Sequence, residues 1–142
     1  MMNIKELRIG SIVVDKKDNS VIRISTISNE GYILGDNSKK AVYKILIEDL
    51  EPLDLDPKVL DQIIEQGVLL KMPRKKYIYY FPDKSTTYFL VFDNKAQNYF
   101  IGMIDLNLPE KHRRLTRPFY EYHKLQNSFN VIYDAELKRL NV

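Results

Sequence analysis

The stretch of residues 76–104, KYIYYFPDKSTTYFLVFDNKAQNYFIGMI, constrains the fold more than any other part of the chain. It holds three runs of β-branched and aromatic residues, separated by polar breaks at residues 82–85 and 93–96. Such runs between turn-forming clusters predict an antiparallel three-stranded meander.

Alternation along the first two strands of this meander gathers the large side chains on one face of each strand. The two sets are Tyr77, Tyr79 and Phe81, and Tyr88, Leu90 and Phe92. A sheet this apolar cannot leave both faces in water, so we expect the two flanking helical segments to cover it. The tyrosines have two interpretations: core residues with a wet hydroxyl, which is favoured, or a stacking platform for a ligand.

The first third of the chain has a different pattern, with short apolar runs at close spacing. We predict strands at residues 9–14, 21–28, 32–34 and 41–47, with Gly, Asn and Asp between them, and a last short strand near residues 51–53. This spacing favours a small SH3-like, partly open β-barrel. Barrels of this kind bind many different ligands, so the fold alone does not indicate a function.

A short helix is predicted at residues 57–66. Asp56 can cap its free N–H groups, Pro57 suits the first helical position, and Gly67 can adopt the left-handed conformation that ends a helix. A second helix is predicted at residues 119–133, with Asp134 ending it.

The second helix carries one apolar stripe, which we expect to lie on the meander: Tyr122, Leu125, Phe129 and Ile132. Residues 135–142 then form a tail with Leu137 and Leu140 as anchors. The predicted fold class is therefore α+β, with a small β-barrel-like subdomain at residues 1–54 and an α+β subdomain at residues 55–142.

Composition excludes several classes of protein. The 142 residues suffice for a buried core without staples, and there is no cysteine, which rules out disulfides, thiolate metal sites and cysteine nucleophiles. The N-terminus lacks the apolar core of a signal peptide, and no apolar run approaches membrane-spanning length. We expect a cytoplasmic protein that does not contact membranes.

Charge is distributed unevenly. Residues 1–70 hold nine Lys/Arg and twelve Asp/Glu, a net charge of −3, whereas residues 71–142 hold thirteen and seven, a net charge of +6. The basic half either meets a polyanion or is a solvated surface that attracts the acidic half.

Two basic clusters carry the candidate binding residues. The first leads into the meander, and the second lies in residues 105–118, which we predict to be a long surface loop. The candidates are Lys71, Arg74, Lys75, Lys76, Tyr79, Lys111, Arg113, Arg114 and Arg117. Basic residues beside Tyr77, Tyr79 and Tyr80 are the ingredients of a single-strand-binding surface, provided that the two clusters converge. If they point apart, nucleic-acid binding loses most of its support.

The last helix carries a candidate polar site. His123, Gln126 and Asn127 share a helical face, where they form either a polar site or hydrogen bonds that hold the helix in place. The structural role is favoured, because the sequence shows no carboxylate to orient the histidine as a base. No phosphate loop, no nucleophile elbow and no metal-ligand spacing is present, so we expect no cofactor, no metal and no catalysis.

Three segments resemble a family of uncharacterised proteins of Bacteroides-type bacteria and their phages. They are ELRIG at residues 6–10, EDLEPL at residues 48–53, and HKLQN at residues 123–127 continuing to Glu136-Leu137. The family opens with ELRIGN, continues through a pattern like IxPIPLTEEWLLKFGF and ends in HQLQNLYFALTGEEL. The resemblance spans residues 6–137, and its matching motifs are dense only near the two ends of that range.

The departures from the family pattern are local. Ser11 replaces Asn, Asp56-Pro57 replaces Thr-Glu while keeping the capping chemistry, and Ser128, Asn130 and Asp134 replace Leu, Phe and Gly. The last three changes predict a narrower apolar stripe on the closing helix. The resemblance implies a shared architecture and carries no activity or site residue.

The functional expectation is a noncatalytic binding or adaptor protein, of mobile-element origin, with a protein partner. The alternative is a nucleic-acid-binding protein that uses the basic clusters at residues 71–76 and 111–117. An enzyme built on His123 ranks third and would need a concave pocket beside that helix.

Overall fold

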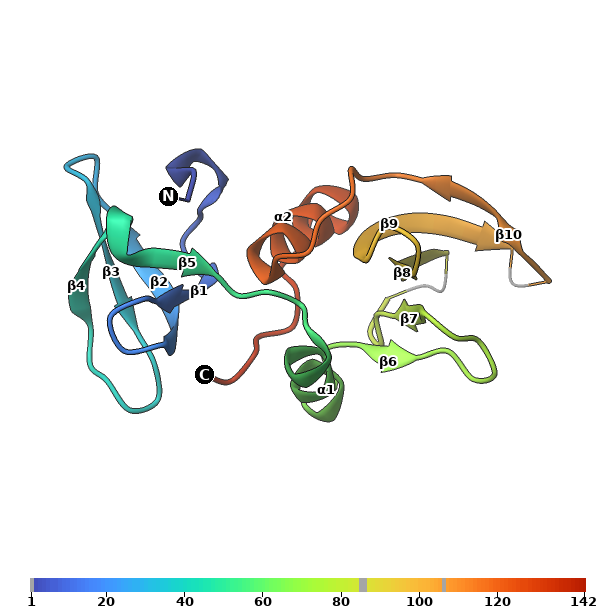
Figure 1. Cartoon of the computed structure of the whole chain (residues 1–142), viewed down its shortest axis with the longest axis horizontal. Coiled ribbons are helices and arrows are strands. Elements are labelled where there is room, and N and C mark those ends of the chain that lie inside the picture. Colours follow the sequence, from blue (N-terminus) through green and yellow to red (C-terminus); the bar gives the residue numbers. More distant parts are fainter. Residues whose placement is uncertain (1, 85–86, 106) are drawn as a thin grey trace. The chain divides into compact units, whose positions relative to one another are not determined.

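The computed structural model describes residues 2–84, 87–105 and 107–142, without the side chains of residues 105 and 108–112. Within these residues the fold has ten strands in two five-stranded antiparallel sheets, together with two α-helices (Figure 1). The predicted α+β class is confirmed. The chain divides into two compact units: unit 1 comprises Met1–Leu55, Glu121–Glu136 and Asn141–Val142, and unit 2 comprises Asp56–Tyr120 and Leu137–Leu140.

The sheet of unit 1 is a curled sheet in the order β4-β3-β2-β1-β5 (Figure 1). Its strands are β1 (Ile12–Asp15), β2 (Ser20–Ile27), β3 (Tyr32–Asp36), β4 (Tyr43–Leu46) and β5 (Leu50–Pro52). A 3-10 helix, η2 (Ile47–Asp49), lets β5 return beside β1. The predicted strands are confirmed, and each of them lies within two or three residues of its expected position.

The core of unit 1 follows from alternation along these strands. In β2, Ile22 and Ile24 are fully buried and the residues between and beside them are not. Side chains that point the same way from the other strands and from the N-terminal segment complete the cluster: Leu7, Val13, Ile33, Ile45, Ile47 and Leu50. One curled face therefore holds the apolar interior.

Helix α1 (Pro57–Glu65) begins and ends as its sequence predicts. The Val59 N–H donates to Asp56 Oδ1 at 2.9 Å, Pro57 occupies the first helical position, and Gly67 has a φ of +72°. Leu60 and Ile63 are buried, which sets the inward face of the helix.

The sheet of unit 2 has the order β10-β9-β8-β7-β6. Its strands are β6 (Leu70–Lys71), β7 (Ile78–Tyr80), β8 (Tyr88–Asp93), β9 (Asn98–Asp105) and β10 (Leu108–Arg114). The predicted three-stranded meander is confirmed as β7–β9. The sequence analysis missed one further strand on each edge.

The prediction of a long surface loop at residues 105–118 is wrong. Residues 108–114 form β10, which pairs with β9 so that Arg113 lies opposite Met103 and Arg114 opposite Gly102. An edge strand is held by backbone hydrogen bonds to its neighbour. A polar and basic segment without apolar alternation can therefore form one. A Cβ at Gly102 would lie 2.7 Å from the Arg113 carbonyl oxygen, so this pairing also needs a glycine.

The strand register confirms the expected face of the meander at Tyr79 and Leu90, whereas Tyr77, expected on the same face, precedes β7 and is 43 % exposed. Tyr79 lies opposite Leu90, and Leu90 lies opposite Ile101, so the three side chains share one face. All three are buried. The core interpretation of this part of the meander therefore holds for Tyr79.

Helix α2 (Tyr122–Tyr133) starts three residues later than predicted and ends at Asp134, which has a φ of +50°. Its start is displaced because Phe119 pairs with Tyr99 of β9 instead of joining the helix. The expected stripe is buried at Tyr122, Leu125 and Phe129.

The structure groups α2 with another part of the chain than the predicted subdomain at residues 55–142. Residues 121–136 belong to unit 1. The chain leaves and re-enters this unit at adjacent points: Asp54 and Glu121 form an antiparallel bridge, and the Tyr122 N–H donates to the Leu53 carbonyl at 2.8 Å. Residues 56–120 are thus inserted between β5 and α2.

Two smaller findings complete the fold. The expected anchors of the tail, Leu137 and Leu140, are 7 % and 5 % exposed. Neither helix in the described part of the chain has the length and apolarity needed to span a membrane.

Candidate functional site

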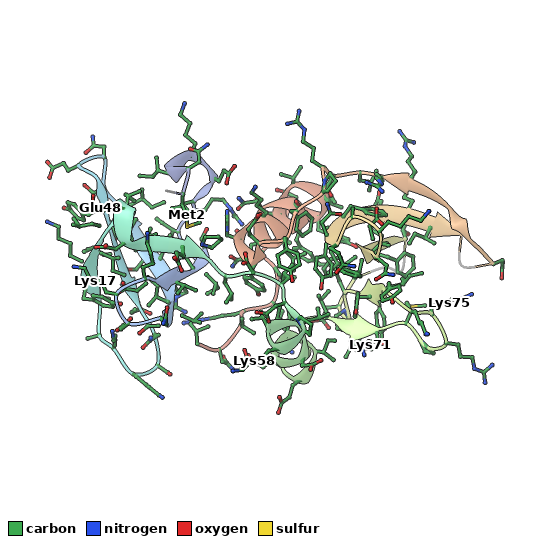
Figure 2. The ribbon with its side chains drawn as sticks, in the orientation of Figure 1. Met2, Lys17, Glu48, Lys58, Lys71 and Lys75 are labelled. Atoms are coloured by element: carbon green, nitrogen blue, oxygen red, sulfur yellow. The ribbon has the colours of Figure 1, made fainter. Side chains whose placement is uncertain are left out.

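The loop that joins β6 to β7 carries one of the two predicted basic clusters. We call residues 71–79 the basic hairpin; Lys71 and Lys75 are labelled in Figure 2. Among the residues that the structure describes, none of its four cationic side chains forms an ion pair: Lys71, Arg74, Lys75 and Lys76. These charges are therefore available to a ligand.

The basic hairpin encloses a hollow of about 420 Å³. Its lining combines the basic residues with the apolar surfaces of Met72, Tyr77, Ile78 and Tyr79. Its volume lies within the range of ligand-binding clefts. The site thus combines positive charge with an apolar surface.

Backbone strain is concentrated in this loop. Arg74 and Tyr77 have φ angles of +60° and +66°, in the left-handed region that costs a residue with a Cβ about 1 kcal/mol or more. The Lys75 N–H reaches the Met72 carbonyl at 3.3 Å, which closes a turn with Pro73 in its second position and Arg74 in its third. Glycine or asparagine usually takes that third position. Strained backbone of this kind is more frequent in ligand-binding loops than elsewhere.

Tyr77 is the exposed aromatic residue of the site. It is 43 % exposed, and its ring centroid lies 5.5 Å from that of Phe92. The contact continues from Phe92 to Tyr99 at 5.0 Å and from Tyr99 to Tyr120 at 6.0 Å. Tyr77 is therefore the outer end of a packed aromatic row, held in place from below.

Tyr79, the tyrosine that the sequence analysis chose for this site, is only 7 % exposed. Burial raises the pKa of its hydroxyl. It lines the hollow as part of the sheet and offers no open ring face, so the stacking role predicted for it does not fit. Tyr77, also named beside the basic cluster, lies in the turn just before β7 and has the exposed ring.

The second basic cluster lies elsewhere in the same sheet. β6 and β10 are the two edge strands, four strand spacings apart, which is about 19 Å along the sheet (Figure 1). Arg113 and Arg117 are exposed, and the side chain of Lys111 lies outside the described residues. The two clusters therefore occupy opposite edges of the sheet.

Arg114 is occupied within the fold. Its guanidinium carbon lies 4.4 Å from the centre of the Phe100 ring, and its Nη2 donates to Asp93 Oδ2 at 3.0 Å. Hydrogen bonds from the Ala96 and Lys95 N–H groups, together with Arg114, lower the pKa of Asp93. Arg114 thus secures the β8–β9 turn instead of presenting a free charge.

The polar residues of α2 were predicted as a site or as structural hydrogen-bond partners. Gln126 Oε1 accepts from the Ile12 N–H at 2.9 Å, and Gln126 Nε2 donates to the Gly10 carbonyl at 3.0 Å. Asn127 donates to the Glu6 carbonyl at 2.7 Å and accepts from Arg8 Nε at 2.6 Å. Both side-chain amides therefore form hydrogen bonds that join the helix to the N-terminal segment.

His123 makes only one polar side-chain contact that the structure shows, and it is with a carboxylate. It is 2 % exposed, and its Nε2 lies 3.5 Å from Glu6 Oε2 on η1 (Ile4–Glu6). Burial lowers the pKa of the imidazole, partly offset by the hydrogen bond to Glu6. The carboxylate that the sequence did not reveal is thus supplied from a segment more than a hundred residues away.

The described residues contain no group of three or more His, Cys, Asp or Glu side chains arranged to hold a metal ion. Comparison with known proteins finds no matching family model, no matching curated protein and no matching solved structure.

Proposed function

We propose that this chain is a noncatalytic binding protein that captures an acidic segment of a protein partner at the basic hairpin. The observation that carries the proposal is the hollow of about 420 Å³ lined by apolar side chains and by basic ones that form no ion pair with any described residue. An apolar side chain flanked by carboxylates matches both features at once.

The position of the basic clusters supports a peptide over a polyanion. A nucleic-acid strand gains affinity by neutralising many phosphates along its length. Here the second cluster lies at the opposite edge of the sheet, and Arg114 is already paired with Asp93. A short acidic peptide needs only the single cluster on the hairpin.

The hairpin holds two left-handed residues that carry a Cβ, whereas the charged turns after β1 and β8 hold one each, at Asn19 and Gln97. Arg74 and Tyr77 hold left-handed conformations in which glycine would be unstrained. Stored strain of this kind is typical of ligand-binding loops. The aromatic row under Tyr77 keeps its ring in a fixed position, which lowers the entropy lost on binding.

The test measures binding of a labelled peptide with one phenylalanine flanked by aspartates, beside a labelled oligothymidine of matched charge. Salt is varied from about 50 to about 200 mM. We expect the peptide to bind more tightly than the oligonucleotide and to lose most of its affinity in the double variant Arg74→Glu, Lys75→Glu. Tyr77→Ala should weaken it by about tenfold or more.

The matched control is the double variant Arg113→Glu, Arg117→Glu, which changes the same charge on the other edge strand and the segment that follows it. It should bind the peptide as the unchanged chain does. Tighter binding of the oligonucleotide, weakened by both double variants alike, would instead favour a nucleic-acid-binding protein. Binding of neither probe would overturn the proposal for this hairpin.

A further inference from the structure

The outer strands of the two sheets differ in how they are protected against further pairing. An exposed edge strand presents unpaired backbone groups that a strand of another chain can use, and proteins usually block it with short strands, prolines or bulges. β6 has two residues, β5 ends in Pro52, and a shift of register interrupts the pairing of β10. β4, the outer strand of the sheet in unit 1, has four residues, no proline and an unbroken register with β3.

The direction of the backbone groups of β4 follows from its pairing with β3. The Ile47 N–H, directly after β4, donates to the Gly31 carbonyl at 3.0 Å, and the register continues unchanged along the strand. In an antiparallel pair, residues that exchange hydrogen bonds alternate with residues whose N–H and C=O groups point the other way. Ile45 is therefore bonded to β3, whereas the backbone groups of Lys44 and Leu46 point out of the sheet.

A hydrogen bond on the other side of β3 leads to the same result. Tyr32 lies opposite Leu46, and its carbonyl accepts from the Ser28 N–H at 3.0 Å. The backbone groups of Tyr32 thus point toward β2, which leaves those of Leu46 without a partner on β3. In the described part of the chain, no other segment bonds to the backbone of Lys44 or Leu46, and both residues are exposed.

The side chains along this edge define what a pairing segment must carry. Lys44 forms no ion pair with a described residue, and its Nζ lies 4.5 Å from the centre of the Tyr32 ring. Two positions away on either side, Val42 is 55 % exposed and Leu46 is 38 % exposed. Residues opposite each other share a face, so an acidic residue opposite Lys44 with apolar residues two positions to either side matches the edge.

Lys44 also disfavours a second copy of this chain as the partner. Two copies of β4 related by a two-fold axis at Lys44 would place the two ammonium groups opposite each other, which is unfavourable. An axis at Ile45 would place each Lys44 opposite Leu46 of the other copy. Neither register compensates the charge.

We propose that β4 binds an extended segment of a partner protein as an added strand, with an acidic residue opposite Lys44 and apolar residues two positions to either side. Backbone hydrogen bonds supply affinity in this mode of binding, and the alternating side chains supply specificity. The inference is independent of the basic hairpin, which lies in the other unit.

The probe is a capped peptide, Val-Thr-Asp-Thr-Val, and the readout is amide hydrogen exchange followed by NMR. In the free protein the N–H groups of Lys44 and Leu46 should exchange fast. At about 5 mM peptide their exchange should slow by about threefold or more, because they gain hydrogen bonds. The N–H groups of Tyr43 and Ile45, which already bond to β3, should not change.

Methylation of the peptide backbone separates an added strand from a contact made by side chains alone. In the added strand the N–H of the peptide's aspartate donates to the Lys44 carbonyl, whereas the N–H groups of its threonines point away from β4. N-methylation of the aspartate should therefore abolish the slowing of exchange, and N-methylation of the first threonine should preserve it. Equal effects of the two methylations would overturn the proposal.

Reversal of charge tests the role of Lys44. Lys44→Glu should weaken binding of the peptide by about threefold or more, and a peptide with lysine in place of aspartate should regain affinity for this variant. Lys58→Glu, which changes an exposed lysine of α1 labelled in Figure 2, is the matched control and should leave the affinity unchanged. Equal affinity in Lys44→Glu and Lys58→Glu would contradict the acidic specificity.

The exchange data also separate this site from the basic hairpin and from self-association. The double variant Arg74→Glu, Lys75→Glu should leave the slowing at Lys44 and Leu46 intact, whatever its effect on peptides bound at the hairpin. Slow exchange of these two N–H groups without peptide, increasing with protein concentration, would assign the edge to a second copy and overturn the proposal. So would unchanged exchange at about 5 mM peptide.

Discussion

At the scale of single residues, His123 is the most unusual group of unit 1. It is a buried base whose neighbours are charged: Glu6 from η1, and Glu121 and Lys124 from its own helix. Glu51 and Lys16 line the same hollow as His123, beside the first turn of α2. Such a group couples its protonation to the stability of the fold.

The sign of this coupling follows from the direction of the shift. Because burial lowers the pKa of His123 below its ordinary value of 6.5, the unfolded chain takes up this proton at a higher pH than the folded chain. The unfolded state therefore binds more protons as the pH falls below about 6.5, and stability declines in that window. Above it the contribution of His123 does not change with pH.

We predict that His123→Gln flattens this dependence. The free energy of urea unfolding, measured at about pH 7.5 and about pH 5.5, should fall more for the unchanged chain than for the variant. His112 is present in both chains and cancels in the comparison. Equal losses in the two chains would show that His123 does not titrate in this way.

At the scale of elements, α2 is joined to the N-terminal segment by hydrogen bonds from its polar side chains. The amide of Gln126 satisfies one donor and one acceptor of the backbone, at Ile12 and Gly10. Ile12 is 2 % exposed, so its N–H has no access to water once the amide is gone. This single side chain therefore aligns a helix with β1.

We predict that Gln126→Ala destabilises the fold by about 1–3 kcal/mol, because it leaves the buried Ile12 N–H unsatisfied. Ser128→Ala, two residues along the same helix and half-buried, is the control and should change stability by less than about 0.5 kcal/mol. Both free energies come from chemical unfolding. A loss for Gln126→Ala no larger than that of the control would contradict the role given to this amide.

The edge strands are the elements of the sheet in unit 2 that sequence patterns did not predict. β7, β8 and β9 are predicted correctly because their alternation records burial on one face. β6 has two residues and β10 is charged, and both exist because a neighbouring strand offers unpaired backbone groups. No property of their own side chains marks them as strands.

At the scale of the whole molecule, unit 1 is discontinuous in sequence. Its chain passes from Leu55 into residues 56–120 and returns at Glu121, beside Asp54. The helix that completes unit 1 thus arrives after an insertion of a separate compact unit. An insertion between two adjacent chain points disturbs the host fold little.

This arrangement predicts how unit 1 behaves in isolation. A shortened chain in which a short Gly/Ser linker joins Leu55 to residues 121–136 should fold, with dispersed amide signals in a proton–nitrogen NMR spectrum. Residues 1–55 alone should not, because the buried Ile12 N–H and the Gly10 carbonyl lose their hydrogen-bond partners on α2. Cooperative unfolding of residues 1–55 without the helix would contradict this division.

Local chemistry accounts for what could be predicted along this chain. The α+β class, the curled sheet, both helices and their ends at Asp56, Gly67 and Asp134 follow from periodicity, capping and left-handed turn residues, which act over a few residues. The residues of both candidate sites were also named in part, because charge and amide groups are visible in the sequence.

Contacts between distant segments account for the rest. Four findings depend on which strands and loops become neighbours in space. They are the placement of α2 with unit 1, the separation of the basic clusters on opposite edges, the exposed ring of Tyr77 where Tyr79 is buried, and the pairing of His123 with Glu6. One sequence without its fold does not record such neighbours, because hydrogen bonding and burial across long separations are properties of the packed chain as a whole.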